Sequence, residues 1–347
     1  MKLLITGGYG FAGSHLVRHI FTTYPTYKIW NLDLLTYAAN PANLWDIEEL
    51  EKELPPSARR YRFVQGDICD KLLIDTLIEE HKFDAIINLA AETHVDRSIH
   101  ESKNFIKTNV LGIHTLLDAI RAHKVPRFVH ISTDEVYGDR DGRDSAHEAS
   151  EFTPSSPYSA SKAAGDFLIQ SYVRTFGIPA IIIRPSNFYG SHQYPEKLIP
   201  LAATNMLEGK KVPVHGDGTQ IRSWLFVHDA CHAIDVLLHR GHEGELYNIG
   251  GIEKKNIDVI HTVAEILQKD PTLHIEFTPD RPGQDKKYSL NWSKFQQAHE
   301  WKAEDHFDEN MRKTVTWYLE NPHWWQPLKQ MSSYADHYSR QKQGRWF

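Results

Sequence analysis

The sequence predicts an α/β protein in which a doubly wound parallel sheet is followed by a smaller C-terminal domain. Short apolar runs alternate with longer amphipathic segments through the first half of the chain, which is the pattern of repeated strand–helix–strand units. The strand candidates are almost continuously apolar, as expected when helices cover both faces of a sheet. A glycine-rich turn directly follows the first strand candidate, and the alternation weakens after Arg184.

The strand candidates share apolar runs, and the helix candidates share apolar residues repeated at helical spacing. We predict strands at residues 2–6, 28–32, 62–65, 85–89, 127–132, 180–184, 225–227 and 246–249. We predict helices at residues 15–21, 72–81, 104–123, 158–176 and 258–268. Residues 143–157 lack a clear period and are expected to form a loop.

Composition excludes several classes of protein. The chain has 347 residues, 41% hydrophobic and 24% charged, so it can build a sizeable core in one or two domains. A net charge of −6 without a basic block argues against a nucleic-acid binder. The apolar N-terminal run soon ends in glycines and no stretch is long enough for a membrane helix, so we expect a cytoplasmic protein without a membrane partner. Cys69 and Cys231 fit a reducing compartment as buried thiols, and we expect no metal site.

The glycine-rich turn after the first strand predicts a dinucleotide site. Gly7, Gly10 and Gly13 stand between a strand and a helix, where they permit a tight turn and let backbone N–H groups approach a pyrophosphate. Asp33 ends the second strand, twenty residues after Gly13, where its carboxylate can bind ribose hydroxyls and repel a 2′-phosphate. The pattern therefore favours NAD over NADP. Asp67 ends another apolar strand and suits the adenine side of the same site.

Two further groups of residues predict acid–base chemistry. Tyr158 and Lys162 lie one helical turn apart, so the ammonium group can lower the pKa of Tyr158 and make it a base near neutral pH. Thr133, Asp134 and Glu135 follow a strand, and the carboxyl ends of such strands face the ligand crevice. Two adjacent carboxyl groups at that place are costly unless they have a function, and the structural alternative is a helix cap beside a surface acid.

Together these motifs resemble the extended short-chain dehydrogenase/reductase family. The triplet Thr133-Asp134-Glu135 is typical of its nucleotide-sugar 4,6-dehydratases, and the similarity continues through residues 31–37, 89–98, 194–200 and 280–283. The resemblance implies a Rossmann-type NAD-binding domain at residues 1–185 with return segments around 225–250. It also implies a nucleotide-sugar-binding domain at residues 186–330, followed by a C-terminal tail at residues 331–347.

The activity that the resemblance implies is the dehydration of a nucleotide-activated glucose to its 4-keto-6-deoxy derivative. Tyr158 would take the proton of the 4-hydroxyl as hydride leaves C4 for NAD⁺, with Thr133 orienting this step. Glu135 would then remove the proton at C5. Protonated Asp134 would give its proton to the departing C6 hydroxyl, and the hydride would return to C6.

The resemblance also assigns residues to the two ligands. Those expected to bind NAD are Gly7, Gly10, Phe11, Ala12, Gly13, Asp33, Leu34, Thr36, Asp67, Ile68, Leu89, Ala90, Ala91, Thr93, Thr108, Tyr158 and Lys162. Those expected to bind the nucleotide sugar are Thr93, Thr133, Asn187, Glu196, Lys197, Leu198, Pro213, Val214, His215, Arg222, Asn256, Arg281 and Gln284. Arg222 and Arg281 suit phosphate recognition because a guanidinium group is a rigid fork of donors.

Several alternatives remain open at this stage. Departures from the family pattern at Phe188, Ser223 and Gln284 lie near the expected nucleotide pocket, so UDP-glucose competes with the preferred dTDP-glucose. An epimerase or a decarboxylase of the same fold would differ at the acid triplet. A regulatory protein that binds NAD without turnover would not need the intact pair of Asp134 and Glu135.

The two long predicted helices also suggest an assembly. Relatives commonly pair through the helices that correspond to residues 104–123 and 158–176, so we expect a homodimer. The residues whose apolar spacing motivates this interface are Ile113, Leu116, Leu117 and Ile120. The same spacing is also compatible with packing in the core of the subunit.

Overall fold

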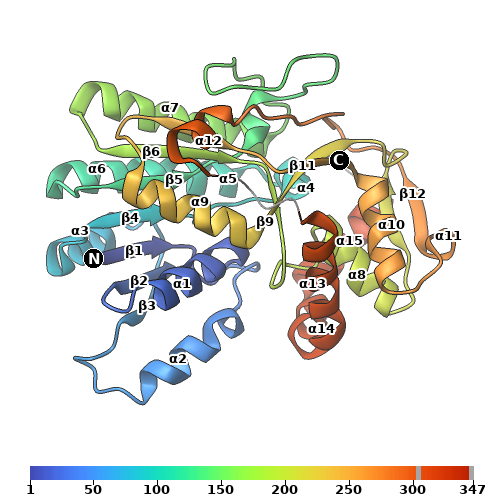
Figure 1. The fold of residues 1–347 in the computed structure, drawn as a ribbon, viewed down its shortest axis with the longest axis horizontal. Helices are drawn as coiled ribbons and strands as arrows, with labels where there is room; N and C mark the ends of the chain where they lie inside the picture. The colour runs from blue at the N-terminus through green and yellow to red at the C-terminus, as the bar shows by residue number, and fades with distance from the viewer. Residues whose placement is uncertain (302–305, 344–347) are drawn as a thin grey trace.

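The computed structural model describes residues 1–301 and 306–343. Within them, a large sheet and its flanking helices form one lobe, and two small sheets with the C-terminal helices form a second lobe beside it (Figure 1). This arrangement confirms the predicted α/β class with a smaller C-terminal part. None of the described helices is long and apolar enough to cross a membrane.

Seven parallel strands form the large sheet in the order β10-β6-β5-β4-β1-β2-β3. Their bounds are β1 Lys2–Thr6, β2 Lys28–Asp33, β3 Tyr61–Gln65, β4 Ala85–Asn88, β5 Phe128–Ile131, β6 Ala180–Pro185 and β10 Leu246–Ile249. From β1, the next strands β2 and β3 are added on one side of the sheet. The chain then returns to place β4 on the other side of β1, and later strands continue in that direction, so the strand order reverses between β1 and β4. At such a reversal the following loops diverge, and a crevice opens at the carboxyl ends of the strands.

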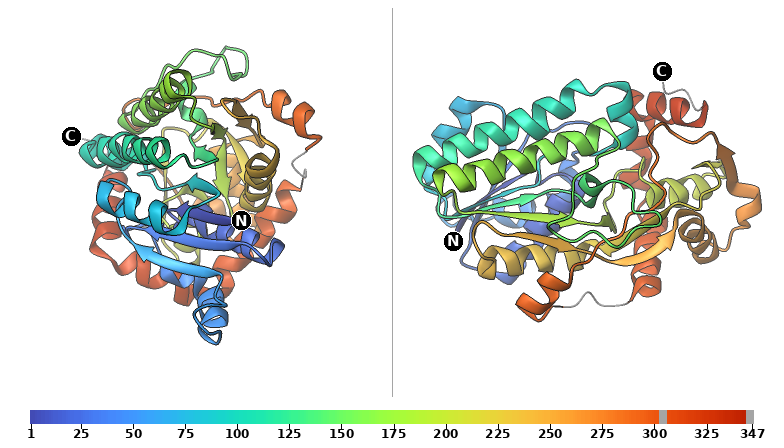
Figure 2. Two further views of the ribbon diagram at one scale, coloured as in Figure 1. Left: turned by 90° about the vertical axis from the view of Figure 1, so that its left-hand side faces the viewer. Right: turned by 90° about the horizontal axis from the view of Figure 1, so that it is seen from above.

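Helices cover both faces of this sheet because alternate residues of its strands are apolar on both sides. Leu3 and Ile5 of β1 belong to one core, and Leu4 belongs to the other. The first core is covered by α1 (Phe11–Thr23), α2 (Trp45–Lys52), α9 (Val227–Arg240) and α12 (Ser293–His299). The second is covered by α3 (Lys71–His81), α6 (Ile113–His123) and α7 (Pro157–Phe176), and Figure 2 shows α6 and α7 lying side by side.

The second lobe is built from segments that follow β6. Its three-stranded sheet consists of β7 (Asn187–Tyr189), β9 (Ile221–Phe226) and β11 (Ile252–Lys255), and β8 (Val212–His215) pairs with β12 (Ile275–Thr278). The helices of this lobe are α8 (Leu198–Leu207), α10 (Asn256–Ile266), α11 (Pro271–His274), α13 (Phe307–Glu320), α14 (Pro322–Gln330) and α15 (Ser332–Gln343). A separate core joins them, with Met311, Trp324 and Trp325 among its buried side chains.

Some sequence-based boundaries need correction. The predicted strand at 225–227 ends with β9 at Phe226, because Val227 begins α9 and Asp229 in the first turn favours a helix start. The predicted helix at 104–123 is divided into α5 (Lys103–Ile106), a π-helical segment at Lys107–Gly112 and α6. Of the two predicted buried thiols, Cys231 is buried but Cys69 is only half-buried.

The proposed dimer contact also needs correction. Its four residues are at most 1% exposed and pack in the core beneath α6, so they face the sheet: Ile113, Leu116, Leu117 and Ile120. The same group of helices exposes other apolar side chains, namely Ile106, Leu111, Phe167 and Phe176. In the predicted tail at 331–347, residues 332–343 form α15, and residues 344–347 lie outside the described part of the chain.

Candidate active site

A cavity of about 430 Å³ lies at the carboxyl edge of the large sheet, lined by residues of both lobes. It extends from the glycine turn after β1 to β8 and β9 of the second lobe. Every residue that the sequence predicts for catalysis, cofactor binding or substrate binding lines this one cavity. The parallel sheet explains this convergence, since the segments that follow its strands all emerge at the same edge.

The glycine turn at one end of the cavity has the shape that a dinucleotide requires. Gly7 has a φ of +73°, and a Cβ atom there would lie 2.8 Å from the backbone nitrogen of Ala90. A Cβ atom on Gly13 would lie 2.1 Å from the carbonyl oxygen of Gly7. No side chain caps the start of α1 at Phe11, so its first N–H groups remain available for an anion. The residues present therefore fit a dinucleotide pyrophosphate.

Asp33 lies where a ribose would be recognised. Its carboxylate is buried at the end of β2 and accepts hydrogen bonds from the backbone N–H groups of Tyr9 (2.9 Å) and Leu35 (2.8 Å). Burial raises the pKa of Asp33, although both hydrogen bonds oppose the rise. Asp67 also lines the cavity and forms an ion pair with Lys107 at 2.7 Å. Burial works against ionisation of Asp67, but the hydrogen bond from Lys107 leaves its pKa below the ordinary value.

The acid pair sits directly after β5 on a short 3₁₀ helix, Asp134–Tyr137. Thr133 caps this helix by accepting a hydrogen bond from the backbone N–H of Glu135 at 3.3 Å. Asp134 and Glu135 are both buried, and Asp134 Oδ2 has no hydrogen-bond partner among the described residues. A buried oxygen of this kind normally has a partner, so it marks a place where a ligand group fits.

The two carboxyl groups differ in what surrounds them. Burial, and then the charge of Glu135, raises the pKa of Asp134 to about 8. Burial also raises the pKa of Glu135, but the cations of Arg281 and Arg222 oppose the rise. At neutral pH Asp134 is therefore mainly protonated, while the arginines favour the ionised form of Glu135. This is the division of roles that an acid and a base require.

Tyr158 and Lys162 do not interact as the sequence suggested. The Lys162 ammonium donates a hydrogen bond to the carbonyl oxygen of Ile131 at 2.7 Å, and burial lowers its pKa to about 8. Burial, and then the carboxylate of Glu135, raises the pKa of Tyr158, while a hydrogen bond from Thr133 opposes the rise. The direction is therefore opposite to the lowered pKa expected from the sequence, because burial and a nearby anion both disfavour the phenolate of Tyr158.

The second lobe presents cations and amides to the other end of the cavity. Arg222 lies over the ring of Tyr288 at 4.2 Å, and Arg281 forms an ion pair with Asp96 at 2.6 Å. Four buried polar atoms there have no partner among the described residues: Arg281 Nε, Asn187 Oδ1, Asn256 Oδ1 and Gln284 Oε1. Together, these groups can receive a phosphorylated, hydrogen-bonding ligand.

Glu196 and Lys197 line the cavity but are held by protein groups. Glu196 pairs with Arg97 at 2.8 Å and accepts a hydrogen bond from Tyr37 at 3.0 Å. The ammonium group of Lys197 donates to the carbonyl oxygen of Thr93 at 3.0 Å. Their predicted contact with substrate stays a prediction.

Asp96, Tyr288 and Gln341 are among the lining residues that the sequence analysis did not predict. Asp96 belongs to a segment that carried the family resemblance, and Tyr288 follows another such segment. The hydroxyl of Tyr288 donates to Asp285 at 2.7 Å and lies 3.4 Å from Glu135. Gln341 comes from α15, which sequence comparison within the family did not single out. No local pattern marks Gln341, because its place depends on how α15 returns to the cavity.

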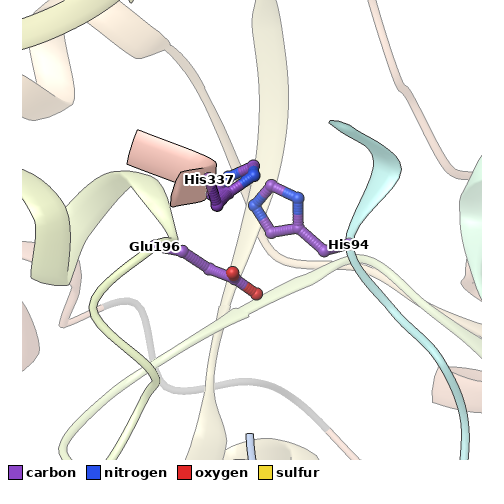
Figure 3. A group of neighbouring side chains, drawn as sticks. All are labelled: His94, Glu196 and His337. Carbon is purple, nitrogen blue, oxygen red and sulfur yellow. The ribbon is translucent and has the colours of Figure 1, made fainter. Parts of the chain in front are cut away.

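A buried cluster joins α15 to this edge of the cavity. His94, Glu196 and His337 point toward one another, and their potential ligand atoms all lie within 4.8 Å of one another (Figure 3). Glu196 already shares its charge with Arg97. A divalent cation would therefore compete with a guanidinium group, and the chemistry of this donor set favours a contact between elements over a metal centre.

Comparison with known proteins gives consistent similarities. Residues 4–314 match the family described as GDP-mannose 4,6-dehydratase. The dTDP-glucose 4,6-dehydratase of Shigella flexneri is 43% identical, over 95% of this chain and 96% of that protein. The NAD-containing structure of the Streptomyces venezuelae dTDP-glucose 4,6-dehydratase has a TM-score of 0.89 at 42% identity, covering 95% of this chain and 100% of the other. A UDP-glucose 4-epimerase of Thermus thermophilus, also with NAD, reaches a TM-score of 0.82 at 28% identity, over 92% and 99% of the two chains.

Proposed function

This chain belongs to the GDP-mannose 4,6-dehydratase family, and from that premise we propose that it is an NAD-dependent dTDP-glucose 4,6-dehydratase. The reaction removes water from dTDP-glucose and gives dTDP-4-keto-6-deoxyglucose. The observation that carries the proposal is the buried pair of Asp134 and Glu135, held in the same cavity as Tyr158. A 4-epimerase needs no acid and base for elimination, whereas a dehydratase needs both.

The first stage is oxidation at C4 of the sugar. Tyr158 accepts the proton of the 4-hydroxyl in its ionised form, and the hydrogen bond from the hydroxyl of Thr133 favours that form by opposing the rise in the pKa of Tyr158. When bound along Gly7–Gly13 and Asp33, NAD⁺ supplies a hydride acceptor for C4 and afterwards a hydride donor for C6. Lys162 is 2% exposed and is fixed to the carbonyl oxygen of Ile131, so its cation stays close to the reacting groups.

The second stage is elimination of water. A 4-keto group acidifies the neighbouring C5 hydrogen, and Glu135 removes it as a proton. Asp134 is protonated at neutral pH because burial raises its pKa to about 8, so it can transfer a proton to the C6 hydroxyl. The C6–O bond breaks, water leaves, and a C5–C6 double bond remains until hydride adds at C6 and a proton adds at C5. Each carboxyl group thus has one proton-transfer task.

The nucleotide diphosphate binds in the second lobe. Arg222 and Arg281 supply the cations for the two phosphates, and the orphaned amide oxygens of Asn187 and Asn256 supply acceptors. We assign the residues of β8, Pro213 to His215, to the nucleobase side of the pocket. The division at residue 185 between a cofactor domain and a substrate domain is part of the same proposal.

The test is a parallel incubation of the purified protein with dTDP-glucose and with UDP-glucose. We expect the 4-keto-6-deoxy product from dTDP-glucose at the higher kcat/KM. Faster turnover of UDP-glucose would reassign the nucleotide and keep the reaction. A 4-epimerised sugar with no loss of water would overturn the assignment as a dehydratase.

The assembly and location also belong to this proposal. We propose a homodimer in which residues 104–123 and α7 of one chain face those of a second copy, with exposed Leu111 of the π-helical segment and Phe167 of α7 at the contact. Two free thiols, Cys69 and Cys231, and a nucleotide-sugar substrate fit a cytoplasmic enzyme.

A further inference from the structure

The buried face of α15 is partly polar. Tyr334, His337 and Gln341 recur at helical spacing and are 3%, 5% and 7% exposed, so one stripe of the helix faces inward. An inward stripe normally consists of apolar side chains, because buried polar groups cost free energy unless they are paired. Gln341 lines the cavity, and His337 meets His94 and Glu196 at its edge (Figure 3). The stripe therefore contacts the cavity as well as the core of the second lobe.

Gln341 contacts a hub of charged and polar side chains, which consists of buried Asp96 with His215 and Arg281 around it. Its amide nitrogen lies 3.4 Å from Oδ2 of Asp96 and 3.3 Å from Nε2 of His215. The other oxygen of Asp96 accepts a hydrogen bond from Nη1 of Arg281 at 2.6 Å, and Asp96 is 1% exposed. His215 Nε2 also lies 3.5 Å from Oδ2 of Asp96. Asp96 is thus contacted by Gln341, His215 and Arg281, and the first of these comes from the C-terminal helix.

Arg281 is the member of this hub that faces the reacting groups. Its Nε atom is buried without a partner among the described residues, so the guanidinium keeps donor capacity for a ligand. Its cation also acts on Glu135, whose ionisation it favours. A change in how tightly Asp96 holds Arg281 would therefore alter the binding of an anionic ligand.

We propose that Gln341 is a positioning residue for nucleotide-sugar binding, which acts by sharing Asp96 with Arg281. When the amide of Gln341 donates a hydrogen bond to Oδ2 of Asp96, it stabilises part of the negative charge of that carboxylate. The guanidinium of Arg281 is then freer to bind a phosphate. Without that donor, the carboxylate of Asp96 attracts the guanidinium group of Arg281 more strongly. Arg281 is then less available to the anionic ligand, which binds more weakly. This inference rests on the proposed function only for the identity of the ligand, a nucleoside diphosphate.

The test replaces Gln341 by methionine and by alanine in the full chain. Gln341→Met keeps the length and packing of the side chain but removes the amide, whereas Gln341→Ala removes both. Asp336→Ala, on the exposed face of the same helix, is the matched control. Binding of dTDP is measured by calorimetry, and kcat and KM are measured with dTDP-glucose.

We expect both Gln341 variants to weaken dTDP binding and to raise KM by about 5- to 10-fold. This is somewhat less than the usual loss for one hydrogen bond to a charged group, because the contact of Gln341 with Asp96 is long, at 3.4 Å. The value of kcat and the melting temperature should stay close to those of the wild type for Gln341→Met and for Asp336→Ala. Equal dTDP affinity of Gln341→Met and the wild type would overturn the proposal. A loss confined to Gln341→Ala would also overturn it, because that result indicates packing alone.

A second comparison asks whether the effect passes through Arg281. In an Arg281→Gln background, Gln341→Met should change dTDP affinity by less than about twofold, since coupled residues are not additive. A full 5- to 10-fold effect in that background would contradict the proposed route. The binding measurement is separate from turnover: a wild-type protein that binds dTDP but forms no 4-keto product refutes the proposed function and leaves this comparison intact.

Discussion

The replacement of Asp134 by asparagine tests the acid step most directly. Asparagine keeps the shape and hydrogen-bonding ability of the side chain but carries no transferable proton. The oxidation at C4 uses Tyr158 and not Asp134, so we expect reduction of bound NAD⁺ to survive. Loss of a positioned acid typically slows its step by about 10²–10⁴-fold, and we expect dehydration to slow by that amount.

The pH dependence of the wild type gives the same argument a second, quantitative form. Since burial and Glu135 raise the pKa of Asp134 to about 8, about ten molecules in eleven carry the proton at pH 7, and about one in eleven at pH 9. The rate of dehydration should therefore fall as pH rises through 8, by about tenfold per unit above it. An Asp134→Asn variant should lose this alkaline limb.

The assay is a single turnover with dTDP-glucose, in which absorbance reports the reduced cofactor and mass analysis reports loss of water. We expect the reduced cofactor to appear at the normal rate and then to persist in Asp134→Asn. Glu135→Gln should in addition lose exchange of the C5 hydrogen with solvent deuterium. Asp141→Asn, an exposed acid nearby, serves as the control. Dehydration at the wild-type rate in both Asp134→Asn and Glu135→Gln would show that the pair is structural, and the dehydratase assignment would lose its basis.

Four further outcomes follow from the geometry. Asp33→Asn should lower NAD content about tenfold or more, because a charged acceptor for ribose hydroxyls is lost. The nucleotide released when the wild-type protein is denatured should be NAD. Release of NADP would refute the argument from Asp33. Gly13→Ala should destabilise the fold by about 1–3 kcal/mol in urea unfolding, because its Cβ would lie 2.1 Å from the Gly7 carbonyl oxygen; an unchanged midpoint would contradict the required close approach. Because the pKa of Asp134 is raised in the folded chain, Asp134 keeps its proton there at pH values above about 4, where the unfolded chain has released it. The contribution of Asp134 to the free energy of unfolding is therefore greatest below about pH 4 and is lost as the pH rises to about 8. Asp134→Asn should consequently raise the melting temperature more at pH 8 than at pH 5. Phe167→Glu should convert the proposed homodimer to a monomer by light scattering, and a monomeric wild type would remove the interface.

Local patterns determined much of this protein. The glycine turn at Gly7 and Gly13, Asp33 at the end of β2 and the acid pair after β5 each depend on residues close together in sequence. A parallel sheet brings the ends of its strands to one edge, so predicting the strands was enough to predict that these residues share one cavity. The two covered faces were predicted from the almost continuously apolar strands, whereas the order of the strands came from the structure.

Only the tertiary structure decided how these residues are surrounded. Helical spacing predicted an apolar stripe on α6, but it could not tell a core from an interface, and Leu116 and Leu117 turned out to be core. Spacing placed Lys162 near Tyr158, yet burial and the carboxylate of Glu135 set the direction of the tyrosine pKa. Gln341 meets Asp96 across 245 positions of the chain. Such a contact depends on the packing of a whole lobe, and burial and charge balance are sums over neighbours that local sequence does not specify.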